Sequence, residues 1–296
     1  MEGQSIREKY GFMFSQMSQV AHAAAEIDET NVFEEANPET RKFMDKLAGE
    51  NLKEGSAVSG VENFEAFFDA IESGKSGLIL MEHYSNLDLP ALIYLLEHSK
   101  SEKCRALAPR IVAIAGMKLN EENPMVRAFA ESFTRVVIYP TRSLNKISDE
   151  SEKAAQEAKA RKINLAAMKA MDKCKRSGKP ILVFPSGTRY RPGKPETKRG
   201  LREIDSYLRL FDKMILVTIN GLSLHIDPEN PDDMLADIIR PDKMIFTASP
   251  LFDCKTFRKE YMASLPEDEA DPKQKVIDHV MSLFDAQHDE VEKTRI

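Results

Sequence analysis

The chain has 296 residues, 42% of them hydrophobic and 30% charged, and its formal net charge at pH 7 is −6. This composition predicts a soluble globular protein with a substantial core and excludes a disordered chain. An acidic balance argues against a dedicated nucleic-acid binder, which usually has a strongly basic surface. The longest apolar runs are about six residues, whereas a bilayer span needs roughly 20, so we expect no transmembrane segment.

The N-terminal residues are charged and lead into no continuous apolar run, so no secretory signal is visible. Cys104, Cys174 and Cys254 are odd in number and widely spaced, which matches neither a disulfide framework nor a CxxC metal site. These features favour a cytoplasmic protein without a metal centre.

The N-terminal part is helical in pattern. Apolar residues recur at three- and four-residue steps from Ile6 to about Ile27, and a second helix is expected over Pro38–Ala48. The Met and Phe residues of these helices favour a bundle core over the alternative, a membrane-docking face. Asn51–Gly60 has the composition of a linker. We therefore expect an N-terminal helical bundle, residues 1–55, before a larger domain, residues 56–296.

Strand-like and helical runs alternate in the remainder of the chain. The expected strands are Leu78–Met81, Ile111–Ala115, Arg135–Tyr139, Ile181–Phe184, Ile215–Ile219 and Met244–Ala248. Helical stretches separate most of them, at Pro90–Ser99, Pro124–Phe133, Ser148–Arg176 and Leu201–Phe211. This alternation predicts an α/β fold with a largely parallel sheet covered by helices. Active sites in such sheets lie beyond the carboxyl ends of the strands.

The stretch Gly77–Pro90 contains the first of these strands and, after it, a pair of residues that can perform acid–base chemistry. His83 comes directly after the apolar run, and Asp88 lies five residues later. In one continuous helix the two side chains would point about 140° apart. If His83 instead lies in a strand-to-helix turn and Asp88 starts the helix, the carboxylate can fold back onto the imidazole. Such a pair can deprotonate a hydroxyl, although a surface histidine beside a capping aspartate has the same spacing.

A second stretch, Ile181–Pro192, also follows a strand and begins a strongly basic segment. The basic residues are Arg189, Arg191, Lys194, Lys198, Arg199 and Arg202, against the single acidic residue Glu196. Guanidinium groups bind phosphate through forked hydrogen bonds, and the Pro-Ser-Gly turn offers backbone donors. The alternative is a charged surface loop. The spacing of Gly187 and Lys194 does not fit a P-loop, and Phe184 stands where a nucleophile elbow requires glycine.

Arginines around a further strand are additional candidates. Arg142 lies in the loop after Arg135–Tyr139, and Arg135 starts that strand. Either residue can serve as a phosphate ligand, although an ordinary salt-bridged arginine is the simpler interpretation of Arg135.

Taken together and in order, the two motifs resemble those of a known family. Glu82-His-Tyr-Ser-Asn-Leu-Asp-Leu-Pro resembles the His-x4-Asp motif of the glycerolipid acyltransferases, and Phe184-Pro-Ser-Gly-Thr-Arg-Tyr-Arg-Pro resembles their later Pro-x-Gly-x-Arg motif. The Arg-Tyr-Arg-Pro ending and the run from Arg135 through the Lys- and Ala-rich helix are most similar to the soluble plastid-type glycerol-3-phosphate 1-acyltransferases, and the resemblance covers roughly Val61 to Ser249. The resemblance implies a mixed sheet wrapped by helices and a small helical N-terminal domain.

The resemblance also implies roles for individual residues. His83 matches the family's catalytic base, Asp88 its orienting carboxylate, and Arg189 and Arg191 its phosphate-binding arginines. Where the plastid-type pattern has a basic cluster with lysine and histidine, this chain has Arg142 between Thr and Ser. Arg142 is then expected to act there alone.

The implied reaction moves a fatty acyl group from acyl-CoA or acyl carrier protein to the sn-1 hydroxyl of glycerol-3-phosphate, a step of phospholipid biosynthesis. No cofactor is needed because a thioester is already activated. A peripheral membrane contact is expected because the product is amphiphilic. Two alternatives stay open at this point: acylation of lysophosphatidic acid by the same pair, and a non-catalytic module that binds an anionic lipid headgroup.

Overall fold

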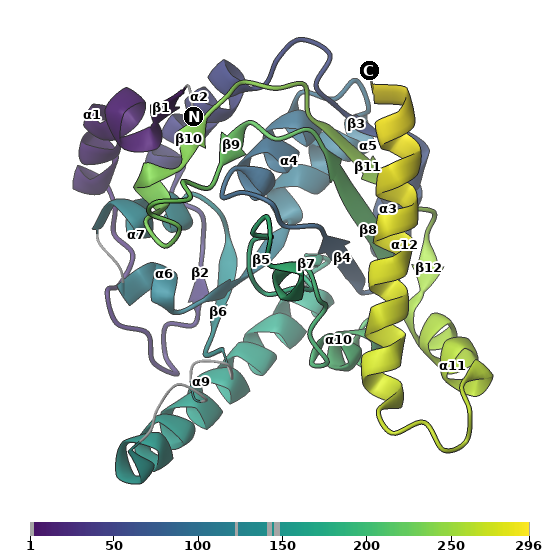
Figure 1. Cartoon of the computed structure of the whole chain (residues 1–296). Coiled ribbons are helices and arrows are strands. Elements are labelled where there is room, and N and C mark those ends of the chain that lie inside the picture. The colour runs from purple at the N-terminus through teal and green to yellow at the C-terminus, as the bar shows by residue number, and fades with distance from the viewer. Residues whose placement is uncertain (1–2, 122–123, 141–143, 145–148, 296) are drawn as a thin grey trace.

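A nine-stranded sheet forms the centre of the molecule in the computed structural model, which describes residues 3–121, 124–140, 144 and 149–295 (Figure 1). The strand order is β2-β6-β5-β7-β4-β8-β11-β3, and β12 pairs with β8 outside this path. The strands are β2 (Phe33–Glu34), β3 (Ala57–Ser59), β4 (Gly77–Met81), β5 (Val112–Gly116), β6 (Arg135–Ile138), β7 (Ile181–Val183), β8 (Lys213–Asn220), β11 (Ile245–Ala248) and β12 (Phe252–Asp253). A short sheet of β1 (Gln4–Ser5), β10 (Ile238–Ile239) and β9 (Leu224–His225) lies apart from it.

The central strands β4 to β8 run parallel. β2 is antiparallel to β6, β11 and β12 are antiparallel to β8, and β3 is parallel to β11. The prediction of a mixed, largely parallel sheet is therefore confirmed. Every residue of β4, from Gly77 to Met81, is buried. A continuous apolar strand of this kind requires covering layers on both faces of the sheet.

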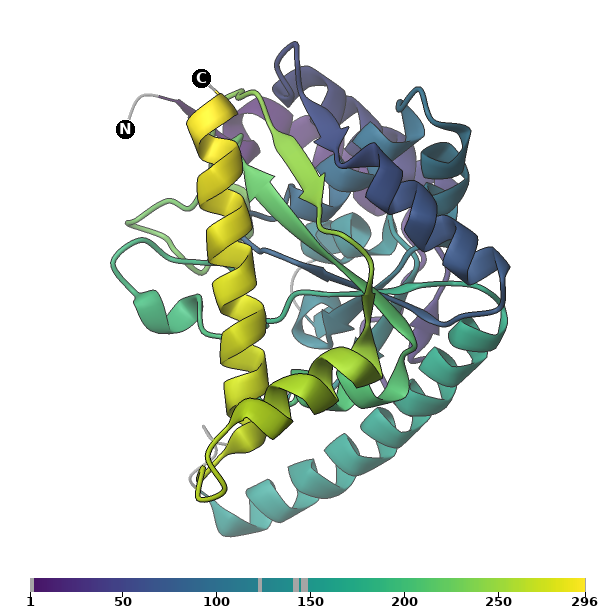
Figure 2. The same cartoon turned by 90° about the vertical axis from the view of Figure 1, so that its right-hand side faces the viewer.

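Helices supply those two layers (Figures 1 and 2). One layer contains α1 (Ile6–Gln19), α2 (Pro38–Asn51), α3 (Val61–Glu72), α4 (Asp88–Glu97), α5 (Glu102–Leu107) and α7 (Pro124–Glu131). The other contains α9 (Glu150–Arg176), α10 (Ile204–Leu210) and α12 (Pro272–Arg295), and Figure 2 shows α12 crossing in front of β8. The remaining helices are α6 (Lys118–Glu121), α11 (Cys254–Ser264) and the short 3-10 helices η1 (Ala108–Arg110), η2 (Pro195–Thr197) and η3 (Met234–Ala236).

The residues of β4 alternate between the two layers. Ile79 and Met81 pack with α3 and α4, whereas Leu78 and Leu80 pack with α9, α10 and α12. This period of two is the ordinary geometry of a strand. It also determines the sides toward which the next residues of the chain point.

Two expectations about the N-terminal part are wrong. The first helix ends at Gln19 instead of about Ile27, because the backbone amides beyond it are taken by the carboxylate of Glu131, which accepts from the N–H groups of His22 and Ala23. The expected linker is also structured, since α2 continues to Asn51 and β3 joins the sheet beside β11. Helices α1 and α2 share one apolar core with α3 and α4. The division at residue 55 stays a prediction.

Within the described ranges, no helix is both long enough and apolar enough to cross a bilayer.

Candidate active site

His83 and Asp88 lie in a turn at the carboxyl end of β4. The ladder with β8 extends one residue past the strand, where the N–H of Glu82 donates to the carbonyl of Val217 at 3.1 Å. Helix α4 then begins at Asp88, and its first turn contains Pro90. The strand-to-helix turn expected from the spacing is therefore present.

The carboxylate of Asp88 organises this turn. Its Oδ2 lies 3.0 Å from Nδ1 of His83 and accepts the backbone N–H groups of Tyr84 at 2.6 Å and Ser85 at 2.9 Å. Its Oδ1 accepts the hydroxyl of Ser85 at 2.7 Å. The side chain of Asp88 is fully buried, and that of His83 is 16% exposed. When Nδ1 of His83 carries the proton and donates it in a hydrogen bond to the carboxylate, Nε2 is the nitrogen that can accept a proton.

The imidazole of His83 is also held by an aromatic neighbour. It stacks on the ring of Phe184 with a centroid distance of 3.9 Å and an interplanar angle of 16°. Phe184 follows β7, the parallel neighbour of β4, so the two rings meet at the same edge of the sheet. The hydrogen bond to Asp88 and this stacking restrict the ring to one orientation, as a proton-transfer group requires.

The basic loop after β7 lies against the same turn. Gly187, with φ of +63°, donates its N–H to the carbonyl of Phe184 and reverses the chain there. The N–H of Tyr190 then donates to the carbonyl of His83 at 2.8 Å. The residues on either side of Tyr190 are Arg189 and Arg191. The structure thus brings the two predicted motifs together.

Arg189 is held by a carboxylate that the sequence analysis did not identify. Its guanidinium pairs with Oδ2 of Asp237, which also accepts the side-chain amide of Asn86 at 3.2 Å. Asn86 belongs to the turn between His83 and Asp88, so Asp237 joins the arginine loop to that turn. Asp237 is fully buried and Arg189 is 10% exposed. Burial raises the pKa of Asp237 to about 6, against the opposing effects of Arg189 and Asn86.

The other candidate arginines occupy different environments. Arg191 pairs with Asp232 at 2.7 Å, and this pair is open to solvent, with Asp232 86% exposed. Arg135 is only 2% exposed and pairs with Glu34 at the start of β6, which is the sheet edge opposite to His83. Arg135 therefore forms a buried salt bridge and is not part of the candidate site. Arg142 lies outside the described residues.

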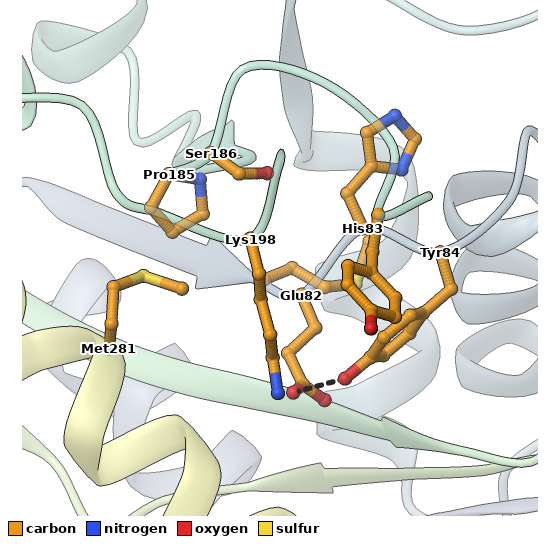
Figure 3. Close-up of a pocket in the computed structure, with 9 residues that line it drawn as sticks. Glu82, His83, Tyr84, Pro185, Ser186, Lys198 and Met281 are labelled. Atoms are coloured by element: carbon orange, nitrogen blue, oxygen red, sulfur yellow. Dashed lines mark hydrogen bonds between the residues drawn. The ribbon is translucent and has the colours of Figure 1, made fainter. Parts of the chain in front are cut away.

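A second polar cluster lies on the other side of the turn, and the sequence analysis missed it (Figure 3). The buried carboxylate of Glu82 accepts hydrogen bonds from the hydroxyl of Tyr84 at 2.7 Å, from the N–H of Ile219 at 2.8 Å and from Nδ1 of His288 at 3.0 Å. His288 belongs to α12. Glu82 raises the pKa of His288, and burial together with Glu82 raises the pKa of Tyr84.

Strand alternation explains why the two clusters separate. Glu82 continues the side of Leu80, toward α12, whereas His83 continues the side of Met81. Figure 3 shows the two side chains pointing in opposite directions. A small pocket adjoins Glu82, where Lys198 enters and forms an ion pair with Asp285 at 2.6 Å. Glu82 directly precedes His83 in the motif, and this position was a sequence signal for its role at the turn. Nothing in the sequence pointed to His288.

A model of the acyltransferase family matches residues 56–213, more than half of the chain. The chain belongs to the acyltransferase family. The matched region contains both the His83 turn and the arginine loop. No curated protein matches the chain in sequence. Acyl transfer, with an acyl donor and an acceptor, is the chemistry of this family.

The arrangement is chemically suited to that transfer. A buried, fully hydrogen-bonded carboxylate orients a partly exposed imidazole, and cationic side chains lie on the neighbouring loop. This combination can remove a proton from an alcohol and can bind an anionic group close by. In the described part of the chain, no three His, Cys, Asp or Glu side chains cluster as metal ligands do.

Proposed function

We propose that the protein transfers a fatty acyl group from acyl-CoA or acyl carrier protein to the sn-1 hydroxyl of glycerol-3-phosphate. The observation that carries this proposal is the hydrogen bond from Tyr190 to His83, which joins the arginine loop to the turn of the His83 and Asp88 pair. An acceptor with a hydroxyl and a phosphate a few ångströms apart matches such a neighbourhood.

His83 acts as the general base in this proposal. Its Nε2 takes the proton of the sn-1 hydroxyl while the oxygen attacks the thioester carbonyl. The tetrahedral intermediate then collapses, the C–S bond breaks, and the proton passes from the imidazolium to the leaving thiolate. Asp88, buried and fixed by the amides of Tyr84 and Ser85, keeps the imidazole in the productive tautomer and stabilises the imidazolium.

The arginines bind the acceptor phosphate in this proposal. Arg191 is the more accessible of the two, and its solvent-exposed partner Asp232 is readily exchanged for a phosphate, because exposed ion pairs contribute little free energy. Arg189 is held next to the turn by Asp237 and so arrives pre-oriented. Arg142 is the third proposed ligand and lies outside the described residues.

We infer a cytoplasmic location with a peripheral membrane contact. The cysteines Cys104, Cys174 and Cys254 are all buried and unpaired, which fits a reducing compartment. The proposed product is an amphiphile that must reach a bilayer, which supports a transient contact with a membrane surface.

An acceptor and donor series tests the proposal. Purified full-length protein is incubated with radiolabelled glycerol-3-phosphate or lysophosphatidic acid, each with acyl-CoA and with acyl carrier protein loaded with the same acyl chain. We expect acylation of glycerol-3-phosphate, with the acyl chain at the sn-1 position of the labelled product. Preferential acylation of lysophosphatidic acid assigns the second reaction. Binding of either phosphate compound without turnover assigns a non-catalytic module and refutes the enzyme proposed here.

A further inference from the structure

An apolar groove with a basic rim lies between α9 and α10, away from the site described above. The described chain has four exposed large apolar side chains, and three of them border this groove: Leu165, Met168 and Leu210, with exposed fractions of 56%, 52% and 45%. The fourth, Phe12, lies on α1. Leu165 and Met168 are one helical turn apart and share a face of α9.

The groove is a fixed feature of the fold. Its floor includes Met171 of α9 and Phe211, both of which are buried in the core. The ammonium of Lys175 lies 5.1 Å from the centre of the Phe211 ring and donates to the carbonyl of Leu210. These contacts join the end of α10 to α9, so the exposed apolar side chains are presented together.

Positive charge is concentrated around the same side chains. From Lys159 to Arg176 there are seven Lys or Arg residues and one Asp, a local charge of +6 on a chain whose net charge is −6. Lys162 and Lys169 flank Leu165 at helical spacing, and both are exposed. Among the described residues, neither lysine forms an ion pair. Exposed apolar side chains between unpaired cations are typical of a helix that lies on an anionic bilayer.

We propose that this face of α9, with the end of α10, docks the protein on an anionic lipid surface. Leu165, Met168 and Leu210 enter the region between the headgroups and the acyl chains, while Lys162 and Lys169 contact lipid phosphates. A second copy of the chain is a poor occupant, because two faces of the same charge repel. An acidic protein is also a poorer occupant than a bilayer. A stable protein interface buries about 800 Å² on each partner, or roughly 20–30 residues, whereas eight residues line the groove.

The docking face and the catalytic candidates lie at opposite edges of the sheet. β4 and β8 are parallel, and Phe211 precedes the start of β8, whereas His83 follows the end of β4. α9 runs along the lower margin of the molecule in Figure 1. Attachment through α9 therefore leaves His83 facing the aqueous phase. The proposal stands on this surface and not on the identity of the acceptor.

Vesicle co-sedimentation of the purified full chain tests the proposal. The vesicles contain phosphatidylcholine alone or with 30% phosphatidylglycerol, at 50 mM and 500 mM NaCl. We expect the protein to sediment with the anionic vesicles at low salt, and expect this binding to fall strongly at high salt because exposed charges are screened. The double variants Leu165→Gln/Met168→Gln and Lys162→Glu/Lys169→Glu should each reduce the partition coefficient by about tenfold or more.

Matched substitutions elsewhere provide the controls. Phe12→Gln removes the other exposed apolar side chain, and Lys259→Glu reverses an exposed charge on α11. Both should bind vesicles as the wild type does, and all variants should melt at the wild-type temperature because the changed side chains are exposed. Equal binding to neutral and anionic vesicles, or loss of binding in Phe12→Gln alone, overturns the proposal. The proposal is also overturned if the wild-type protein does not bind vesicles, and binding of purified acyl carrier protein through α9 in that case would identify a different partner. Turnover of water-soluble substrates, measured in parallel, reports separately on the proposed reaction.

Discussion

The turn after β4 separates two polar clusters that are built in different ways. On one side His83 meets Asp88, five residues away in the chain, and every contact of the carboxylate is made within the turn. On the other side Glu82 meets His288, which is 206 residues away and belongs to the last helix. Both clusters are a histidine at 3.0 Å from a buried carboxylate. Their surroundings, and not the pair itself, distinguish them.

This difference assigns them different tasks. The backbone carbonyl of His83 accepts a hydrogen bond from the arginine loop, and its ring is fixed by Phe184. His288 instead uses its contact with Glu82 to attach α12 to the turn. We therefore expect the first cluster to govern turnover and the second to govern stability.

Replacing each histidine by glutamine tests this division most directly. His83→Gln should lower kcat by about 10³-fold, because loss of a general base typically costs 10²- to 10⁴-fold. His288→Gln, the same change on the opposite side of the turn, should keep kcat within about threefold of wild type. Steady-state rates of acyl transfer, with folding checked by circular dichroism, make the measurement. Equal losses in the two variants would contradict the division.

Asp88→Asn should have the next largest effect. The amide oxygen can still accept the N–H groups of Tyr84 and Ser85, so the turn is retained. It carries no charge to stabilise the imidazolium, and kcat should fall by about 10²-fold with little change in KM. Ser85→Ala removes the hydrogen bond to Oδ1 and the one that the Ser85 hydroxyl accepts from the N–H of Leu87, but it keeps the charge of Asp88. It is the control, with an expected loss below about tenfold. A large rise in KM with unchanged kcat would remove Asp88 from the catalytic role.

Local spacing made half of this site predictable. The His-x4-Asp separation is compatible with contact only in a strand-to-helix turn, and an apolar run followed by Pro90 indicated such a turn. The same reasoning predicted the parallel strands, whose apolar runs are buried on both faces. It failed for β3, because Gly55, Ser56 and Gly60 beside it indicate a linker and because it gains its partner β11 only in the folded sheet.

The other half depends on contacts between distant segments. Asp237 and His288 lie in stretches without a motif, and their partners Arg189 and Glu82 are reached only when the sheet and α12 are assembled. The early end of α1 has the same origin, since the buried carboxylate of Glu131 takes the amides that a longer helix would use. Periodicity reports on one segment at a time, so it contains no information on such partners.

Arg189→Met separates binding of the acceptor from stability. The acceptor KM should rise by about tenfold, since one charged phosphate contact is lost. The variant should also lose about 3–5 kcal/mol of unfolding free energy at pH 7.5, because Asp237 is then buried without a counterion. Protonation relieves this cost. Arg189 lowers the pKa of Asp237, which is about 6 in the wild type, so its removal raises that pKa further; the loss of stability should therefore shrink as pH falls toward 6 and stay constant below it.

The double variant Arg189→Met/Asp237→Asn is the control for this experiment. A neutral amide in place of the carboxylate needs no counterion, so urea denaturation at pH 7.5 should recover most of the lost stability. The acceptor KM should stay high, because the guanidinium is still absent. Recovery of KM together with stability would show that Arg189 acts only through the fold.

His288→Gln should show the smallest effect, and that effect should depend on pH. Glu82 raises the pKa of His288 above its usual 6.5, so the charged pair stabilises the folded state fully below pH 6.5 and ceases to do so as pH rises through the folded-state pKa. His288 is 24% exposed and Glu82 2%, and we expect the variant to lose about 1–2 kcal/mol at pH 6 and clearly less at pH 9. Urea denaturation of wild type and variant at both pH values measures the difference. A loss that does not change with pH would mean that His288 attaches α12 by packing and not by its charge.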